Sequence, residues 1–239
     1  MELKPMVYRF ESIDSTNNEA KRHIENGGEL PALFIADRQT AGRGRQGKSF
    51  FSEGGLYMSL ALPFDVLKGD VLRATTLTAV AVAQVFEKEF GKRLLIKWVN
   101  DLYFEDRKVC GILCETVYDK GTLKAKAVVI GVGINLGVSD FPSELKGIAG
   151  GIFCDCADKD KLARLISGRI IEIICGQEDY IGFYKSRCFV VGKDIYFTEN
   201  GETKEARAVG INDDLALIIE MPDKSRRALS SGEISIRVK

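Results

Sequence analysis

The chain has few of the residues that bind transition metals. It holds one histidine, His23, among 239 residues, and none of its six cysteines belongs to a Cys-x-x-Cys pair. Zinc sites usually need paired ligands of these types at short spacing. The nearest approach is Cys154-Asp155-Cys156, and against it stands the default interpretation of buried, inert thiols. Cys110 and Cys114 fit that default, because their even spacing would place both on one face of a strand.

The chain also lacks an excess of charge of either sign. Its 34 Lys and Arg residues balance 34 Asp and Glu residues, whereas nucleic-acid-binding proteins usually carry a basic excess. No apolar run is long enough to span a membrane. The first residues, Met1 to Pro5, have no apolar segment like that of a signal peptide. These absences predict a soluble, cytoplasmic protein with neither DNA nor a membrane as its partner.

The length and composition are those of a protein with a sizeable core. A chain of 239 residues with 45% hydrophobic content should form one large domain, or a large domain with a small one. Before residue 188 the pattern predicts strands mixed with helices, which follow Asp14–Asn17 and then cover about 71–90, 159–175 and 178–187. From Cys188 onward the pattern changes to short strands, which fits a small barrel. We therefore expect an α+β fold, with a mixed β-sheet and helices over residues 1–187 and a small β-barrel over 188–239.

A glycine-rich basic loop, Ala41 to Lys48, is the most distinctive stretch. It contains three glycines and three cations and no acidic residue. Glycine lets successive backbone N–H groups converge on an anion, and arginine adds forked donors that match phosphate or carboxylate. A solvated basic turn is the alternative, and we favour an anion-binding loop.

Two phosphate-loop patterns match this loop in letters but not in context. Gly42 to Gly47 fits G-x-G-x-x-G, and Gly42 to Ser49 fits the P-loop pattern. Both mechanisms need a helix to begin where the loop ends. Here Gly54-Gly55 breaks any helix, and an alternating strand pattern follows. We expect neither phosphate loop, unless a helix begins at Lys48.

One lysine interrupts the apolar run expected as a core strand, Leu94 to Val99. A lysine in such a strand is costly unless a negative charge pairs with it. An anionic ligand or an internal carboxylate would meet that need for Lys97, and we favour the ligand. Asn100 and Asp101, at the end of the strand, supply oxygens suited to Mg²⁺ and an amide for recognition.

Other polar and glycine positions leave two interpretations open. Ser15, Thr16 and Asn17 either cap the first helix or face a ligand at its start. Gln39 either recognises a polar ligand or is solvated. The glycines of Gly131-Val132-Gly133 bare one face of a strand, either for a ligand or for close packing of a neighbouring strand.

In this order and spacing the motifs resemble the biotin protein ligases, the biotin–[carboxylase] ligase family. The resemblance runs from about Ile13 to Arg237. It implies a class II synthetase-like catalytic fold over residues 1–187 and an SH3-like barrel over 188–239. The paired motifs GRGR…G and KW-x-ND carry it, with Ser15-Thr16-Asn17, Gln39, 107–112, Gly133-Ile134-Asn135 and 232–235.

The resemblance implies a two-step reaction. The carboxylate of biotin attacks the α-phosphate of MgATP and gives biotinyl-5′-AMP and pyrophosphate. A lysine of a biotin carboxyl carrier protein then attacks the mixed anhydride, and AMP leaves. Two anions must meet in the first step, so cations must offset their repulsion. The implied cofactors and partners are biotin, ATP, Mg²⁺ and the carrier, and a homodimer is an option.

The resemblance also implies a role for each motif residue. The catalytic set is Arg45, Lys97 and Asp101, with Asp101 as the metal ligand. The biotin-binding set is Ser15, Thr16, Asn17, Gln39, Gly42, Arg43, Gly44, Arg45, Lys97 and Gly111. The ATP-binding set is Arg43, Arg45, Lys48, Phe50, Asn100, Lys108 and Asn135. Phe50 stands where the family often has a tryptophan over adenine, and Val99 replaces its usual proline.

Three alternatives are weighed against this hypothesis. A lipoate or octanoate protein ligase or transferase would share the fold, but the basic loop and the C-terminal barrel favour biotin. A non-catalytic nucleotide-binding module is weaker, because Arg45, Lys97 and Asp101 are intact. Some relatives combine the ligase with an N-terminal DNA-binding domain. Only 14 residues precede Ser15, so we expect the monofunctional ligase.

Overall fold

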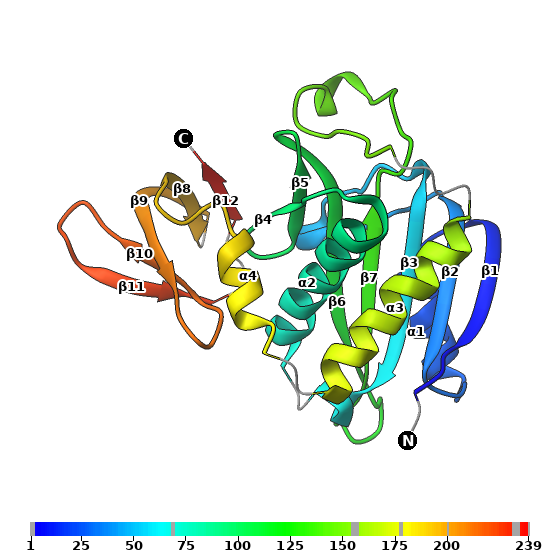
Figure 1. The fold of residues 1–239 in the computed structure, drawn as a ribbon. Coiled ribbons are helices and arrows are strands. Elements are labelled where there is room, and N and C mark those ends of the chain that lie inside the picture. Colours follow the sequence, from blue (N-terminus) through cyan, green and yellow to red (C-terminus); the bar gives the residue numbers. More distant parts are fainter. Residues whose placement is uncertain are drawn as a thin grey trace.

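The computed structural model describes residues 3–67, 70–153, 158–176, 179–199, 201–230 and 235–238. A seven-stranded sheet forms the larger part (Figure 1). Only β1 and β2 are parallel, and every other neighbouring pair is antiparallel. The predicted mixed sheet is therefore confirmed. In spatial order its strands are β1 (Met6–Ile13), β2 (Ala32–Gln39), β3 (Glu53–Pro63), β7 (Ala125–Ile134), β6 (Arg107–Tyr118), β5 (Asp101–Phe104) and β4 (Leu95–Lys97).

Helices cover both faces of this sheet. Helix α1 (Thr16–Glu25) packs on one face, where Ala20 and Ile24 join a small buried cluster. Helices α2 (Val71–Phe90) and α3 (Lys159–Gly176) pack on the other face and contribute to the main core. The sheet is therefore the middle layer of the fold, as Figure 1 shows, and both of its faces need apolar side chains.

Helix α2 forms as its sequence predicts. Asp70 caps it by accepting hydrogen bonds from the backbone N–H groups of Leu72 and Arg73, at 2.9 and 3.1 Å. Gly91 ends it in the left-handed region, with φ of 64°, where glycine carries no penalty. Most of the helix is buried between the sheet and α3. This helix therefore makes a rigid support behind the strands.

Two of the predicted elements are shorter than expected. The strand expected over 94–99 is only three residues long, because the chain turns at Trp98–Asn100 and pairs back, with Lys97 opposite Asp101. It lies at the edge of the sheet, so Lys97 ends an edge strand and does not interrupt a core strand. The helix expected over 178–187 is α4 (Ile181–Arg187).

No helix in the described ranges is both long and apolar enough to cross a membrane.

The C-terminal part is a separate five-stranded antiparallel sheet. Its outer strands, β11 and β12, do not pair with one another in the described residues. The structure thus confirms a small C-terminal sheet domain, and closure into a barrel stays a prediction. In spatial order the strands are β11 (Arg226–Leu229), β10 (Leu217–Glu220), β9 (Glu202–Ile211), β8 (Asp194–Glu199) and β12 (Ser235–Val238).

Candidate active site

One cavity of about 690 Å³ collects the predicted site residues. Its volume is in the usual range for small-molecule sites. The N-terminus of α1, the basic loop, the turn after β4 and strands β6 and β7 all contribute to its walls. The predicted residues that line it are Ser15, Thr16, Asn17, Gln39, Arg43, Gly44, Arg45, Lys48, Phe50, Lys97, Asn100, Asp101, Lys108, Gly111 and Asn135. Of the predicted set only Gly42 does not.

Glycines make the floor of this cavity. A Cβ atom at Gly133 on β7 would lie 2.6 Å from Cε1 of Phe50, and one at Gly111 on β6 would lie 2.9 Å from its Cε2. A Cβ atom at Gly131 would lie 2.2 Å from the side-chain oxygen of Asn17. The prediction that alternate glycines bare one face of the strand is confirmed, and other side chains occupy the space in this structure.

The basic loop folds as a small hairpin. The N–H of Gly44 donates to the carbonyl of Lys48 at 2.7 Å, and the N–H of Phe50 donates to the carbonyl of Gly42 at 3.0 Å. Between them lies a short 3₁₀ turn, Arg45–Gly47. No α-helix begins at Lys48, which is extended, so the phosphate-loop alternatives are excluded. Gly42 lies behind the cavity, where a Cβ atom would be 2.3 Å from Ser52 Oγ.

Partly buried hydrogen bonds join the start of α1 to Gln39. The Gln39 carbonyl oxygen accepts from the N–H of Thr16 at 2.8 Å and from its hydroxyl at 3.1 Å. The Gln39 amide nitrogen donates to Ser52 Oγ at 3.0 Å. Ser15 is buried but makes no side-chain capping bond. Capping is therefore the wrong interpretation for Ser15, and ligand contact by these side chains stays a prediction.

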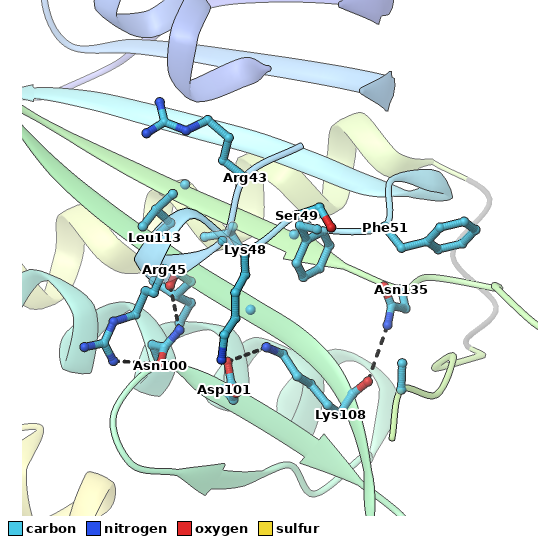
Figure 2. Close-up of a pocket in the computed structure, with 18 of the residues that line it drawn as sticks. Arg43, Arg45, Lys48, Ser49, Phe51, Asn100, Asp101, Lys108, Leu113 and Asn135 are labelled. Atoms are coloured by element: carbon cyan, nitrogen blue, oxygen red, sulfur yellow. Dashed lines mark hydrogen bonds and ion pairs between the residues drawn. The ribbon is translucent and has the colours of Figure 1, made fainter. Parts of the chain in front are cut away.

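The two arginines of the loop point to different places. Arg45 donates to the side-chain oxygen of Asn100 at 3.2 Å. Arg43 donates to the side-chain oxygen of Asn18 on α1 at 3.1 Å and contacts Glu115 at 3.4 Å. Figure 2 shows Arg43 directed away from the group around Asn100. The structure thus places the Arg45 side chain with the candidate catalytic residues and directs the Arg43 side chain toward α1.

The remaining cations gather around Asp101. The Lys108 ammonium lies 2.6 Å from Asp101 Oδ1, and Figure 2 shows Lys48 extending toward the same group. Lys97 lines the same cavity, with its ammonium 6.0 Å from the ring centre of Tyr103. Arg45 and Lys97 therefore face one cavity, although they come from segments far apart in the sequence.

Burial shapes the electrostatics of this group. Burial lowers the pKa of the Arg45 guanidinium, and the nearby Asp101 and Tyr184 oppose that change. Burial and the charge of Asp101 raise the pKa of Tyr103 to about 12. Tyr103 therefore stays neutral at physiological pH. A partly desolvated guanidinium favours the binding of an anion.

Asp101 is the candidate metal ligand. Its buried Oδ1 forms an ion pair with the Lys108 ammonium at 2.6 Å and accepts no other hydrogen bond among the described residues. In the described part of the chain no group of three or more His, Cys, Asp or Glu side chains could hold a metal. One carboxylate suits Mg²⁺, which typically takes its other ligands from water and substrate phosphates.

Cys110, Cys114 and Cys188 fit the expectation of inert, largely buried thiols, whereas Cys175 is exposed and does not fit it. Burial raises the pKa of the Cys110 thiol, and burial also raises that of Cys114 to about 12. A thiol with so high a pKa stays protonated at neutral pH and is a poor nucleophile or metal ligand. The Cys154-Asp155-Cys156 candidate lies outside the described residues.

Sequence reasoning missed one wall of the cavity. Phe141, Leu145, Ile148 and Ala149 line it, and they belong to a segment whose only described helix is the short 3₁₀ turn Ser143–Leu145. Asn135 holds this segment by donating to the carbonyl of Gly150 at 3.0 Å. The apolar residues of this segment follow neither the helical nor the strand period, so its sequence does not indicate that it forms a cavity wall.

Three buried or half-buried polar residues beside the cavity were also missed. Ser52 and Glu115 lie outside the motifs, and Ser59 lies in an apolar strand. A polar residue in an apolar strand is the signal that singled out Lys97. The same test would have found Ser59.

Several known proteins are similar to this chain. A Bacillus spizizenii protein named bifunctional ligase/repressor BirA is 30% identical over 236 residues, which are 95% of this chain and 72% of that protein. A Paracoccus denitrificans biotin–[acetyl-CoA-carboxylase] ligase is 34% identical over 130 residues, 52% of this chain and 51% of that protein. The fold also matches a solved structure, the Aquifex aeolicus biotin protein ligase in complex with biotin and ATP. The TM-score is 0.81 at 23% identity, over 98% of this chain and 99% of that one.

Family models cover both parts of the chain. Residues 190–237 match the biotin protein ligase C terminal domain, which corresponds to the five-stranded sheet. Residues 9–135, in the larger part of the chain, match the family model of the biotin/lipoate A/B protein ligases. This range includes the basic loop, the turn after β4 and the glycine floor of the cavity. The chain therefore belongs to the biotin/lipoate A/B protein ligase family.

Proposed function

We propose that this chain is an ATP-dependent biotin protein ligase. It would activate biotin as biotinyl-5′-AMP and transfer the biotinyl group to a lysine of a biotin carboxyl carrier protein. The observation that carries the proposal is that Arg45, Lys48, Lys97 and Lys108 line one cavity over a glycine floor. The C-terminal match to a biotin protein ligase domain supports biotin over lipoate.

The first step brings two anions together. A carboxylate oxygen of biotin forms a bond to the α-phosphorus of ATP, and the bond to the pyrophosphate leaving group breaks. Lys97 and Arg45 would hold the carboxylate and the α-phosphate, because they face the same cavity. Lys48 and Lys108 would neutralise the departing pyrophosphate. Fixed cations in a partly desolvated site stabilise the charge that develops in the transition state.

Asp101 would hold a magnesium ion together with the triphosphate. Its buried Oδ1, which pairs with the Lys108 ammonium, is suited to a cation, and the ion would supply charge neutralisation at the phosphates. For that to happen Lys108 must leave its contact with Asp101. The negative charge of the triphosphate would attract both the magnesium ion and the Lys108 ammonium. Binding of MgATP alone could therefore replace the Lys108 contact of Asp101 by a contact with the ion.

The second step needs the carrier protein. Its lysine amine attacks the carbonyl carbon of the mixed anhydride, an amide bond forms as the nitrogen loses a proton to solvent, and AMP leaves with the electron pair of the broken bond. Asn100 would orient the amine, and its side chain is fixed by Arg45 and by donation to the carbonyl of Ile112 at 3.0 Å. A homodimer and a cytoplasmic location stay predictions from the sequence.

A parallel comparison of acids tests the proposal. The protein is incubated with ATP and with biotin, lipoate or octanoate, and acid-dependent exchange of radiolabelled pyrophosphate into ATP is measured. We expect exchange with biotin and little with the other two acids. Exchange that depends on lipoate or octanoate alone would move the protein to the other branch of its family. No exchange with any acid would contradict adenylation itself.

A further inference from the structure

Glu115 on β6 lies just outside the cavity and touches two of the segments that form it. Its carboxylate accepts from the Lys21 ammonium at 2.6 Å and from the Asn17 amide at 2.9 Å. The guanidinium of Arg43 contacts it at 3.4 Å. Asn17 and Lys21 belong to α1, and Arg43 belongs to the basic loop. One side chain therefore joins the helix, the loop and the sheet.

The contact with Glu115 fixes which way the Asn17 amide faces. Both N–H bonds of that amide are used, one by Glu115 and the other by the backbone carbonyl of Leu113 at 3.2 Å. The amide oxygen is then turned the other way, where the Ser59 hydroxyl donates to it at 2.6 Å. It stands over Gly131, on the floor of the cavity. Glu115, Leu113 and Ser59 together therefore set the orientation of the Asn17 amide at the cavity wall.

Glu115 also holds the start of the basic loop. Arg43 bonds to Glu115 and to Asn18, and both partners lie on the α1 side of the cavity. These contacts hold the start of the loop toward α1, while Arg45, in the 3₁₀ turn at the tip of the hairpin, reaches Asn100. Without Glu115, Arg43 would keep a neutral partner only, and neutral partners bind arginine more weakly than carboxylates do.

Glu115 is charged when it makes these contacts. Its side chain is 18% exposed. Burial alone would raise its pKa, but the bonds from Lys21 and Asn17 and the charge of Arg43 outweigh burial and lower it. A charged, half-buried carboxylate with three donors holds its partners more firmly than a neutral group does.

We propose that Glu115 is a positioning residue for biotin binding, which shapes the biotin end of the cavity before biotin arrives. It would do so by fixing the Asn17 amide and by holding Arg43 near α1. The inference rests on the proposed function, because it assigns the α1 end of the cavity to biotin. It predicts an effect on biotin affinity, with little effect on the rate once biotin is bound.

Three variants test the inference. Glu115→Ala removes the acceptor and the charge, Glu115→Gln keeps an acceptor for Asn17 without the charge, and the control Lys120→Met removes an exposed ion pair to Glu25 of α1 that does not touch Glu115. Biotin affinity is measured by calorimetry without ATP, and pyrophosphate exchange gives KM for biotin and kcat. Unfolding midpoints show whether each variant is folded.

The expected results separate positioning from stability. Glu115→Ala should raise the Kd and KM for biotin on the order of tenfold, because it removes bonds to a charged group. Glu115→Gln should restore part of that loss. In both variants kcat should stay within about threefold of wild type, and Lys120→Met should change biotin Kd by less than about twofold.

Two results would overturn the inference. One is wild-type biotin affinity in Glu115→Ala, and the other is an equal loss in Lys120→Met, which would make the effect one of general charge or stability. If Glu115→Ala fails to fold, Glu115→Gln carries the test, and unchanged Kd and KM for biotin in that variant would also overturn the inference. If the wild-type protein does not bind biotin, the proposed function itself is wrong, and that outcome is distinct from a normal wild type with normal variants.

Discussion

Lys97 is the last residue of the three-residue strand β4, and it pairs with Asp101 on β5. Its isolation among apolar residues identified it from the sequence, but the reason differs from the one expected. It ends a short edge strand, so its stem is supported while its ammonium faces the cavity. Its neighbours Trp98 and Val99 are buried and anchor the turn that follows. The position suits a fixed positive charge at the reacting phosphate.

Lys97→Ala should therefore slow adenylation on the order of 100-fold or more, because it removes a preorganised charge at the transition state. Biotin-dependent pyrophosphate exchange measures this. Lys92→Ala is the matched control, since the Lys92 ammonium lies over the Phe104 ring and does not line the cavity. Near-normal exchange by Lys97→Ala, or an equal loss in the control, would contradict the assigned role.

Strand β7 shows at the scale of an element how glycine spacing makes a surface. Gly131 and Gly133 lie on one face of the strand. The side chains of Asn17 and Phe50 pack against that face, in the space that Cβ atoms would otherwise fill. The even spacing was visible in the sequence because a strand repeats every two residues. The sequence did not show whether a ligand or a packed side chain would occupy this face of the strand. That depends on contacts with α1 and the basic loop, which the strand's own sequence does not determine.

Gly131→Ala should lower the free energy of unfolding by about 1–3 kcal/mol, because the new methyl group meets the fixed Asn17 amide. It should also weaken biotin binding. Denaturant unfolding and calorimetry measure the two effects. Gly210→Ala on β9 is the control, as its Cβ would meet nothing within 4 Å. Equal stability and biotin affinity in the two variants would argue against close packing at Gly131.

Sequence signals predicted some elements well and others poorly, for physical reasons. Helix α2 was predicted because its cap and stop, Asp70 and Gly91, are local signals. The 94–99 strand was overextended because the turn at Trp98–Asn100 depends on pairing with β5. The cavity wall around Ile148 was missed because its structure comes from contacts with Asn135 and Lys108. Local sequence signals singled out most of the residues that line the cavity. Contacts between segments far apart in the sequence determine where their side chains point.

At the scale of the whole molecule, helix α4 and the C-terminal part both support the turn that carries the site. The Trp98 indole donates to the carbonyl of Leu215 at 2.9 Å, and the Tyr184 hydroxyl donates to the carbonyl of Val99 at 3.1 Å. One buried cluster includes Ile96, from the larger sheet, and Phe197, from the smaller one. The two parts therefore share a core, and the turn lies between them.

Tyr184→Phe should lower the free energy of unfolding by about 1–2 kcal/mol, because it leaves a buried carbonyl without its donor. Tyr180→Phe is a close control, since the Tyr180 hydroxyl is buried with no hydrogen-bond partner among the described residues. That change should be neutral or slightly stabilising. Denaturant unfolding compares them, and equal effects would show that the Tyr184 bond adds no stability.

The central claim is that cations from separate segments neutralise biotin and ATP within one cavity. A crystal structure with a stable analogue of biotinyl-5′-AMP tests it most directly. We expect the carbonyl and phosphate of the analogue to contact Arg45 and Lys97, with its biotin end near Asn17. A ligand bound outside this cavity, or one that leaves both cations without contact, would contradict the account.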